Sequence, residues 1–151
     1  MTGTIAVLNG PNLNLLGTRK PEVYGRDTLA DVEALCAREA ATFGLEADCR
    51  QSNHEGVLID AVHELRASAV GFVVNAGAWT HYSIGLRDAL ETIEGPLIEV
   101  HISNVHAREE FRHHSYLSPM ASGIIVGCGI QGYAFAVARI ATLTGSGTLT
   151  A

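Results

Sequence analysis

A regular alternation of apolar runs with amphipathic stretches constrains the fold of this chain more than any other feature. The apolar runs predict short strands over residues 4–8, 70–74, 97–102 and 123–126, and the continuing alternation predicts a further strand near 47–51. Helical spacing of apolar residues predicts helices over 29–43, 58–66, 83–93 and 133–143. Strands that are apolar on both faces need helices on each side. The sequence therefore predicts an α/β fold, a flavodoxin-like doubly wound five-stranded parallel sheet with helices on both faces.

The length of the chain is that of one domain. With 151 residues and a hydrophobic content of 47%, the chain can bury a large part of its unfolded surface in a single core. We expect one α/β domain over residues 1–151, in which the Gly-, Ser- and Thr-rich segment 144–151 is a flexible tail.

The charge pattern argues against a nucleic-acid or membrane partner. Ten Lys and Arg stand against 16 Asp and Glu, and no basic cluster is available to neutralise phosphates. The first basic residue is Arg19, so no basic segment precedes an apolar one, and no apolar run reaches the ~20 residues of a membrane helix. We expect a cytoplasmic protein. Its three cysteines are expected to be packed core thiols: Cys36, Cys49 and Cys128.

Several cofactor motifs are present only in part. The segment 127–132 matches the glycine pattern of dinucleotide-binding folds, but no Asp or Glu follows Glu110 to bind a ribose. The loop histidines His106, His113 and His114 have no cysteine beside them and no metal-specific spacing. We therefore expect neither a metal nor another cofactor, and Lys20, the only lysine, would have to carry any Schiff base.

The long loop after the first predicted strand contains a candidate base. Ligands of open parallel sheets bind beyond the carboxyl ends of the strands, and this loop over 9–19 is followed closely by Tyr24. An ordinary tyrosine has a pKa near ~10 and is almost fully protonated at neutral pH. A nearby cation such as Arg19 favours the ionised form, which is the form a general base needs. The alternative is a solvated loop with an exposed arginine and tyrosine.

The fourth predicted strand contains a candidate acid. Because side chains alternate along a strand, Glu99 and His101 lie on one face of it. A carboxylate next to an imidazole orients the ring and favours its charged form, as a general acid near neutral pH requires. The alternative is a chance ion pair at an exposed strand end.

Other polar residues follow the third and fourth strands. Asn75 and His81 come after the third strand and are suited to a polar ligand, unless His81 merely accompanies a capped helix. After the fourth strand, the backbone N–H groups of 102–103 are suited to an anion. Arg108 and Arg112 then indicate a carboxylate or polyhydroxyl ligand, although arginines at this spacing are also typical of a solvated face.

Five ordered segments, spanning essentially Ile5 to Ala141, resemble the type II 3-dehydroquinate dehydratases of the shikimate pathway. These segments are 9–17 with Arg19 and Tyr24-Gly25; 51–56; Asn75 with 80–81 and 87–89; 99–104 with Arg108, Arg112 and 113–115; and Gly129 with 131–133.

The resemblance implies a cofactor-free lyase that converts 3-dehydroquinate to 3-dehydroshikimate and water through an enolate, without a metal or a Schiff base. It implies that Tyr24, made basic by Arg19, takes a proton from the carbon next to the substrate ketone, and that Asn12 stabilises the enolate. His101, held by Glu99, would then protonate the departing hydroxyl.

The resemblance also implies a homo-oligomer, a dodecamer made of trimers, with a small-molecule substrate. Arg108 would assist on a loop that closes over the site, and Asp88 would come from a neighbouring subunit. The remaining substrate-binding residues would be Asn75, His81, Ile102, Ser103 and Arg112. Two alternatives stay open: a flavodoxin-like module that binds FMN or an anionic metabolite, and another enolising enzyme such as an isomerase.

Overall fold

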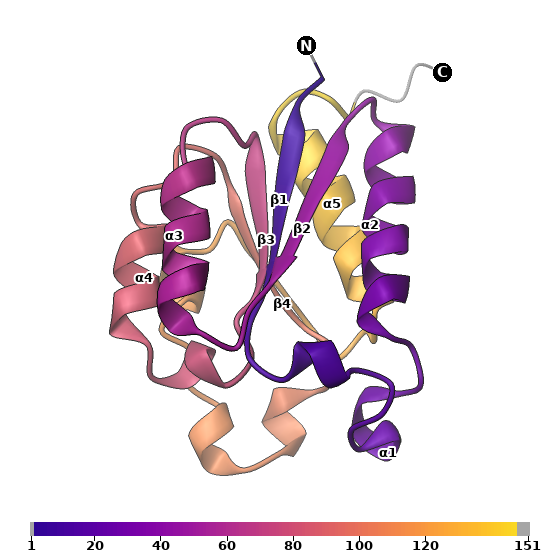
Figure 1. The fold of residues 1–151 in the computed structure, drawn as a ribbon, viewed down its shortest axis with the longest axis vertical. Coiled ribbons are helices and arrows are strands. Elements are labelled where there is room, and N and C mark those ends of the chain that lie inside the picture. The colour runs from indigo at the N-terminus through magenta and orange to yellow at the C-terminus, as the bar shows by residue number, and fades with distance from the viewer. Residues whose placement is uncertain (1, 148–151) are drawn as a thin grey trace.

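Five parallel strands form the centre of the molecule, hydrogen-bonded in the order β2-β1-β3-β4-β5 (Figure 1). The computed structural model describes residues 2–147, and of Val23 and Tyr24 it describes the backbone alone. The strands are β1 (Thr4–Asn9), β2 (Glu46–Gln51), β3 (Gly71–Asn75), β4 (Leu97–His101) and β5 (Gly123–Val126). This is the strand order of flavodoxin-like sheets, so the predicted fold is confirmed.

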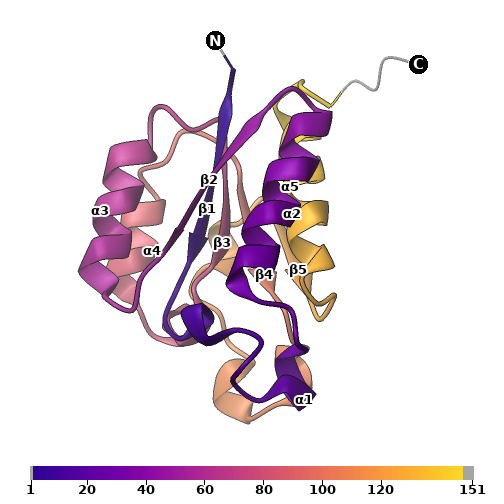
Figure 2. The ribbon, with the colours of Figure 1, turned by 45° about the vertical axis from the view of Figure 1, so that its right-hand side comes forward.

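Helices cover both faces of the sheet, and each pair encloses its own apolar core (Figures 1 and 2). On one face lie α2 (Leu29–Thr42) and α5 (Gln131–Leu143), and on the other lie α3 (Glu55–Leu65) and α4 (Ile84–Leu90). Side chains alternate along β1, so Ile5 contacts the first pair while Leu8 contacts the second. In the described part of the chain, no helix is long and apolar enough to cross a membrane.

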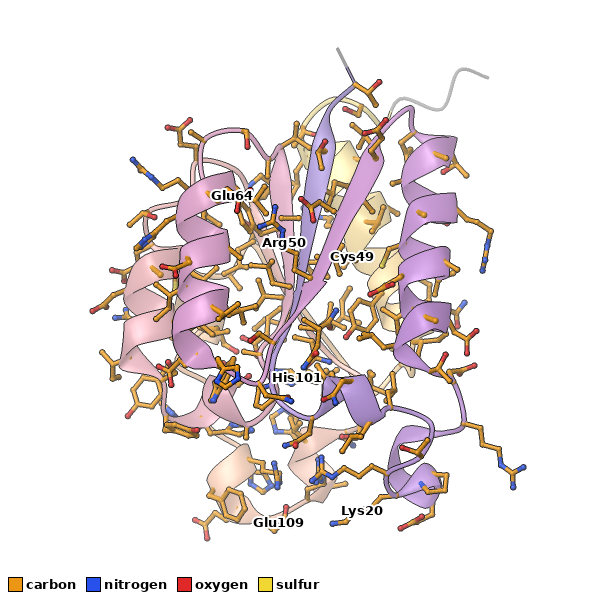
Figure 3. The ribbon with its side chains drawn as sticks, viewed as in Figure 1. Lys20, Cys49, Arg50, Glu64, His101 and Glu109 are labelled. Atoms are coloured by element: carbon orange, nitrogen blue, oxygen red, sulfur yellow. The ribbon has the colours of Figure 1, made fainter. Side chains whose placement is uncertain are left out.

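The two edge strands differ from the expectation that every strand is buried on both faces. The central strand β3 is buried throughout, whereas every residue of β2 is partly or fully exposed. A strand with one neighbour is covered less, and β2 accordingly carries charge. Arg50 pairs with Asp48 on the same strand at 2.9 Å and with Glu64 of α3 at 2.7 Å (Figure 3).

Some predicted boundaries and exposures were wrong. Helix α3 begins three residues before the predicted start at 58, and α4 ends at Leu90 instead of continuing to 93. The predicted loop after β1 contains a 3-10 turn, η1 (Leu13–Leu15), and a short helix, α1 (Pro21–Tyr24). Cys36 is buried as expected, but Cys128 is exposed because it lies in the turn after an edge strand. Of the predicted tail, 144–147 form a turn on α5 and 148–151 lie outside the described residues.

The start of α2 is stabilised by a capping box. The Thr28 hydroxyl accepts from the backbone N–H of Asp31 at 3.2 Å, and the Asp31 carboxylate accepts from the Thr28 N–H at 2.8 Å. We expect Thr28→Ala to lower the free energy of unfolding by about 1 kcal/mol, measured by urea denaturation. Thr42→Ala is the matched control, since the Thr42 hydroxyl bonds only a carbonyl of its own helix. Equal losses in both variants would contradict a role for the cap.

Candidate active site

A pocket lies beyond the carboxyl ends of the strands. Short 3-10 helices and α1 gather at this end of the sheet (Figures 1 and 2). The empty space between the lining residues of the pocket is about 710 Å³, which includes space open to solvent. The loops after β1, β3 and β4 line it, and they bring nine of the twelve predicted residues together. These nine are Asn12, Arg19, Asn75, His81, His101, Ile102, Ser103, Arg108 and Arg112.

Of the other three predicted residues, Glu99 and Asp88 do not line this pocket. Glu99 lies directly behind His101. Asp88 is on α4, where its side chain is 64% exposed and lies 4.0 Å from Arg87. Tyr24 ends α1, and its side chain lies outside the described residues.

Glu99 and His101 form a buried hydrogen-bonded pair at the end of β4. His101 Nε2 lies 2.7 Å from Glu99 Oε2, and the two residues are 6% and 2% exposed. Since Nε2 is engaged by the carboxylate, Nδ1 is the ring nitrogen left for a ligand in the pocket. Figure 3 shows His101 between the sheet and the loop that carries Glu109.

The Glu99 carboxyl is held in its ionised form. Burial acts to raise the pKa of Glu99, but the hydrogen bond and the charge of His101 oppose it. Hydrogen bonds from the Ser118 and Ser115 hydroxyls add to that opposition, and the pKa of Glu99 falls below its usual value. A carboxylate here can stabilise a protonated imidazole.

His81 is set up as a neutral acceptor. Its Nδ1 lies 2.8 Å from the carbonyl oxygen of His114, which can only accept, so Nδ1 must carry the proton. Burial lowers the pKa of His81, which the His114 contact opposes and the nearby His101 reinforces. The two rings stack with centroids 6.4 Å apart. Neutral His81 therefore offers Nε2 to a ligand hydroxyl.

Three guanidinium groups, from Arg19, Arg108 and Arg112, make the pocket positive within a chain of net charge -6. Arg112 Nε donates to Glu109 Oε2 at 2.6 Å, and Arg108 Nη1 lies 3.5 Å from Ser103 Oγ. The Arg108 and Arg112 side chains are largely covered, so they do not form the solvated face considered above. Such a pocket attracts an anion such as a carboxylate.

Comparisons with known proteins identify the family of this chain. The family model described as "Dehydroquinase class II" matches residues 3–141. The chain belongs to the class II dehydroquinase family.

Relatives of this chain come from several bacteria. It is 62% identical to the 3-dehydroquinate dehydratase of Streptomyces avermitilis over 144 residues, which cover 95% of this chain and 91% of the relative. It is 64% identical to that of Variovorax paradoxus over 141 residues, 90% of this chain and 97% of the relative. The solved type II dehydroquinase of Propionibacterium acnes superposes with a TM-score of 0.88 at 43% identity, covering 94% of this chain and 98% of that one.

A buried hydrogen-bond network supports the pocket, and the sequence did not predict the roles of Tyr133 and Asn9 in it. The Tyr133 hydroxyl donates to Asn9 Oδ1 at 2.6 Å and accepts from Asn75 Nδ2 at 2.9 Å. Tyr133 is fully buried, and burial raises its pKa, so it stays a neutral phenol. The network fixes the Asn75 amide, whose Oδ1 accepts from the Gly77 N–H at 3.2 Å. A signal was available, because Asn9 and Asn75 each follow directly after a predicted strand, and the structure pairs these two strands.

The loop after β1 is held by Asn53, another residue for which the sequence predicted no role. Its Oδ1 accepts from the backbone N–H of Asn12 at 2.9 Å and from Gln51 Nε2 at 3.1 Å. Asn12 has a φ of 68°, a left-handed conformation that asparagine tolerates better than most residues. Asn53 thus holds the backbone that presents the Asn12 side chain to the pocket.

Proposed function

We propose that this chain is a cofactor-free hydro-lyase that converts 3-dehydroquinate to 3-dehydroshikimate and water. One observation carries the proposal: the buried Glu99–His101 pair faces a pocket lined by three arginines and Asn12. This set of residues can bind an anionic hydroxy acid, stabilise an oxyanion and deliver a proton in the same place.

The first step is removal of a proton from the carbon next to the substrate ketone. Tyr24, as the tyrosinate, accepts this proton, and Arg19 of the same loop favours the ionised form. The C–H electron pair moves to the ketone, which becomes an enolate. Asn12 lies on the pocket wall to donate a hydrogen bond to that oxygen, and one such donor is typically worth ~3 kcal/mol in the transition state.

The second step is loss of the hydroxyl group. The enolate oxygen re-forms the carbonyl group, and the electron pair of the enolate C=C shifts to form the new carbon–carbon double bond. The carbon–oxygen bond to the hydroxyl breaks as this pair shifts. His101 delivers the Nδ1 proton to the departing oxygen, which leaves as water, and the Glu99 carboxylate stabilises the imidazolium until then.

Residues around this pair orient the substrate. Arg112 and the backbone N–H groups of Ile102 and Ser103 bind the carboxylate, while Asn75 and neutral His81 bind ring hydroxyls. Arg108 assists from the segment that closes over the site.

The working unit is a homo-oligomer in the cytoplasm, a dodecamer built from trimers. The exposed position of Asp88, away from the pocket of its own chain, supports a role in the site of a neighbouring subunit. Light scattering on active enzyme tests the assembly, and a fully active monomer would contradict it.

Purified protein incubated with 3-dehydroquinate tests the proposed activity. The product is a conjugated enone, so turnover appears as new ultraviolet absorbance. Turnover without that absorbance would favour an isomerase, and a yellow protein without turnover would favour a flavin-binding module.

We expect borohydride to leave the enzyme active, even when substrate is present. The only lysine, Lys20, is exposed and does not line the pocket, so its amine is not placed to attack a ketone bound there. Residual activity and intact mass are the measurements, and acetone with borohydride on a denatured sample is the labelling control. Substrate trapped on Lys20 with loss of activity would overturn the non-covalent mechanism.

A further inference from the structure

The segment between β4 and β5 is held by hydrogen bonds against the loop after β3, next to the pocket. It contains three 3-10 helices: η3 (Val105–Ala107), η4 (Glu110–Arg112) and η5 (Ser118–Met120). The His114 carbonyl receives the hydrogen bond from His81, and the Tyr116 N–H donates to the carbonyl of Thr80 at 2.9 Å. The same stretch that supplies Arg108 and Arg112 is therefore tied to the loop after β3.

Two serines tie this segment to the buried carboxylate as well. Ser115 Oγ and Ser118 Oγ each donate to Glu99 Oε1 at 2.9 Å, while the other oxygen, Oε2, faces His101. A carboxylate taken out of water needs such donors to remain ionised. Both oxygens of Glu99 are thus engaged, and the orientation of the carboxylate plane is fixed.

We propose that Ser118 and Ser115 are positioning residues that keep Glu99 ionised and aimed at His101, and so couple the proton donor to the segment that carries Arg112. This inference rests on the proposed function, because it assigns the serines to the acid half of that reaction. Neither serine touches the reacting atoms, and each acts through Glu99.

The two serines make different sets of hydrogen bonds, so the bond from Ser118 to Glu99 can be tested by itself. Ser115 Oγ also accepts from the backbone N–H groups of Leu117 and Ser118, each at 3.0 Å, so its loss would also loosen the turn. The Ser118 hydroxyl makes its described hydrogen bond to Glu99 alone. Ser118→Ala therefore removes one donor from the carboxylate and leaves the turn bonds intact.

The groups around Glu99 determine what this substitution changes. His101 on the same strand and His81 from η2 (Gly77–His81) are the titratable neighbours. In the sheet, the register partners of Glu99 are the apolar residues Val74 and Ile124. The hydroxyl of Ser118 lowers the pKa of Glu99, so the ionised form is present above that pKa and is lost as pH falls through it. Without the hydroxyl, the pKa rises and activity is lost at a higher pH.

The test is the pH profile of kcat/KM for wild type, Ser118→Ala and Ser118→Thr. We expect the acidic limb of Ser118→Ala to lie roughly one pH unit higher, and Ser118→Thr, which keeps a hydroxyl, to restore it. Ser122→Ala is the matched control. The Ser122 hydroxyl accepts at 3.3 Å from the N–H of Leu97, which lies on β4 like Glu99, but it does not contact the carboxylate. Its profile should coincide with that of wild type.

A measurement without substrate separates this inference from the proposed function. Carbon-13 NMR titration of the Glu99 carboxyl, assigned with Glu99→Gln, should show the same upward displacement in Ser118→Ala. Absence of dehydroquinate turnover in wild type would defeat the proposed function and leave this titration decisive for the serines. An unchanged Glu99 titration overturns the inference. If Ser118→Ala does not fold, Ser118→Cys replaces it, since a thiol is a weaker donor, and an unchanged titration there has the same meaning.

Discussion

Replacing His101 with asparagine is expected to reduce kcat/KM for dehydroquinate by roughly 10²- to 10⁴-fold. Asparagine keeps a polar side chain of similar reach but has no proton to deliver to the leaving hydroxyl. Without that proton, hydroxide itself must depart from the enolate. The first step does not need His101, so exchange of the substrate C–H proton with deuterated water should persist while dehydration stops.

His106→Asn is the control for this substitution. His106 is exposed and does not line the pocket, so the same chemical change there should leave both rates close to wild type. Thermal unfolding of both variants checks that the fold survives. A His101→Asn enzyme that dehydrates within a few-fold of wild type would remove His101 from its role as the acid.

Replacing Tyr24 with phenylalanine is expected to cause a loss of similar size, roughly 10²- to 10⁴-fold, and to abolish proton exchange as well. The ring is retained, and only the oxygen proposed to accept the C–H proton is lost. Because every later event follows from the enolate, this variant should stop at the start of the reaction. The pair of variants thus separates the two steps: exchange without dehydration for His101→Asn, and neither for Tyr24→Phe.

Tyr82→Phe is the matched control, since Tyr82 is exposed on the surface and outside the pocket. Both activities of that variant should remain near those of wild type. Retained proton exchange in Tyr24→Phe would show that another group is the base.

Much of the fold could be predicted from local pattern. Strand β3 is buried along its whole length, so its apolar run is continuous in the sequence and marks it as a central strand. Edge strand β2 contains Asp48 and Arg50. The strand itself was predicted over 47–51, but no local rule shows that it lies at the edge of the sheet. Helix ends were predicted less well, because the end of α4 depends on how it meets neighbouring elements.

Part of the candidate site could likewise be predicted from local pattern, and part could not. The two-residue repeat of a strand is enough to place Glu99 and His101 side by side. The donors that hold Glu99 ionised are 16 and 19 residues further along the chain, and the Tyr133 hydroxyl meets Asn9 across 124 residues. No periodicity relates residues at such separations.

The sequence by itself determined the layered α/β architecture, the edge of the sheet where the chemistry lies, and the residue types available there. The architecture and the edge follow from short-range rules, because apolar periodicity selects strands and helices, and parallel strands place their carboxyl ends at one edge. Only the tertiary structure decided which side chains touch. It left Asp88 away from the pocket of its own chain, fixed the proton of His81 on Nδ1, and attached two serines to Glu99. Those outcomes depend on packing between distant segments, where a shift of one ångström makes or breaks a hydrogen bond.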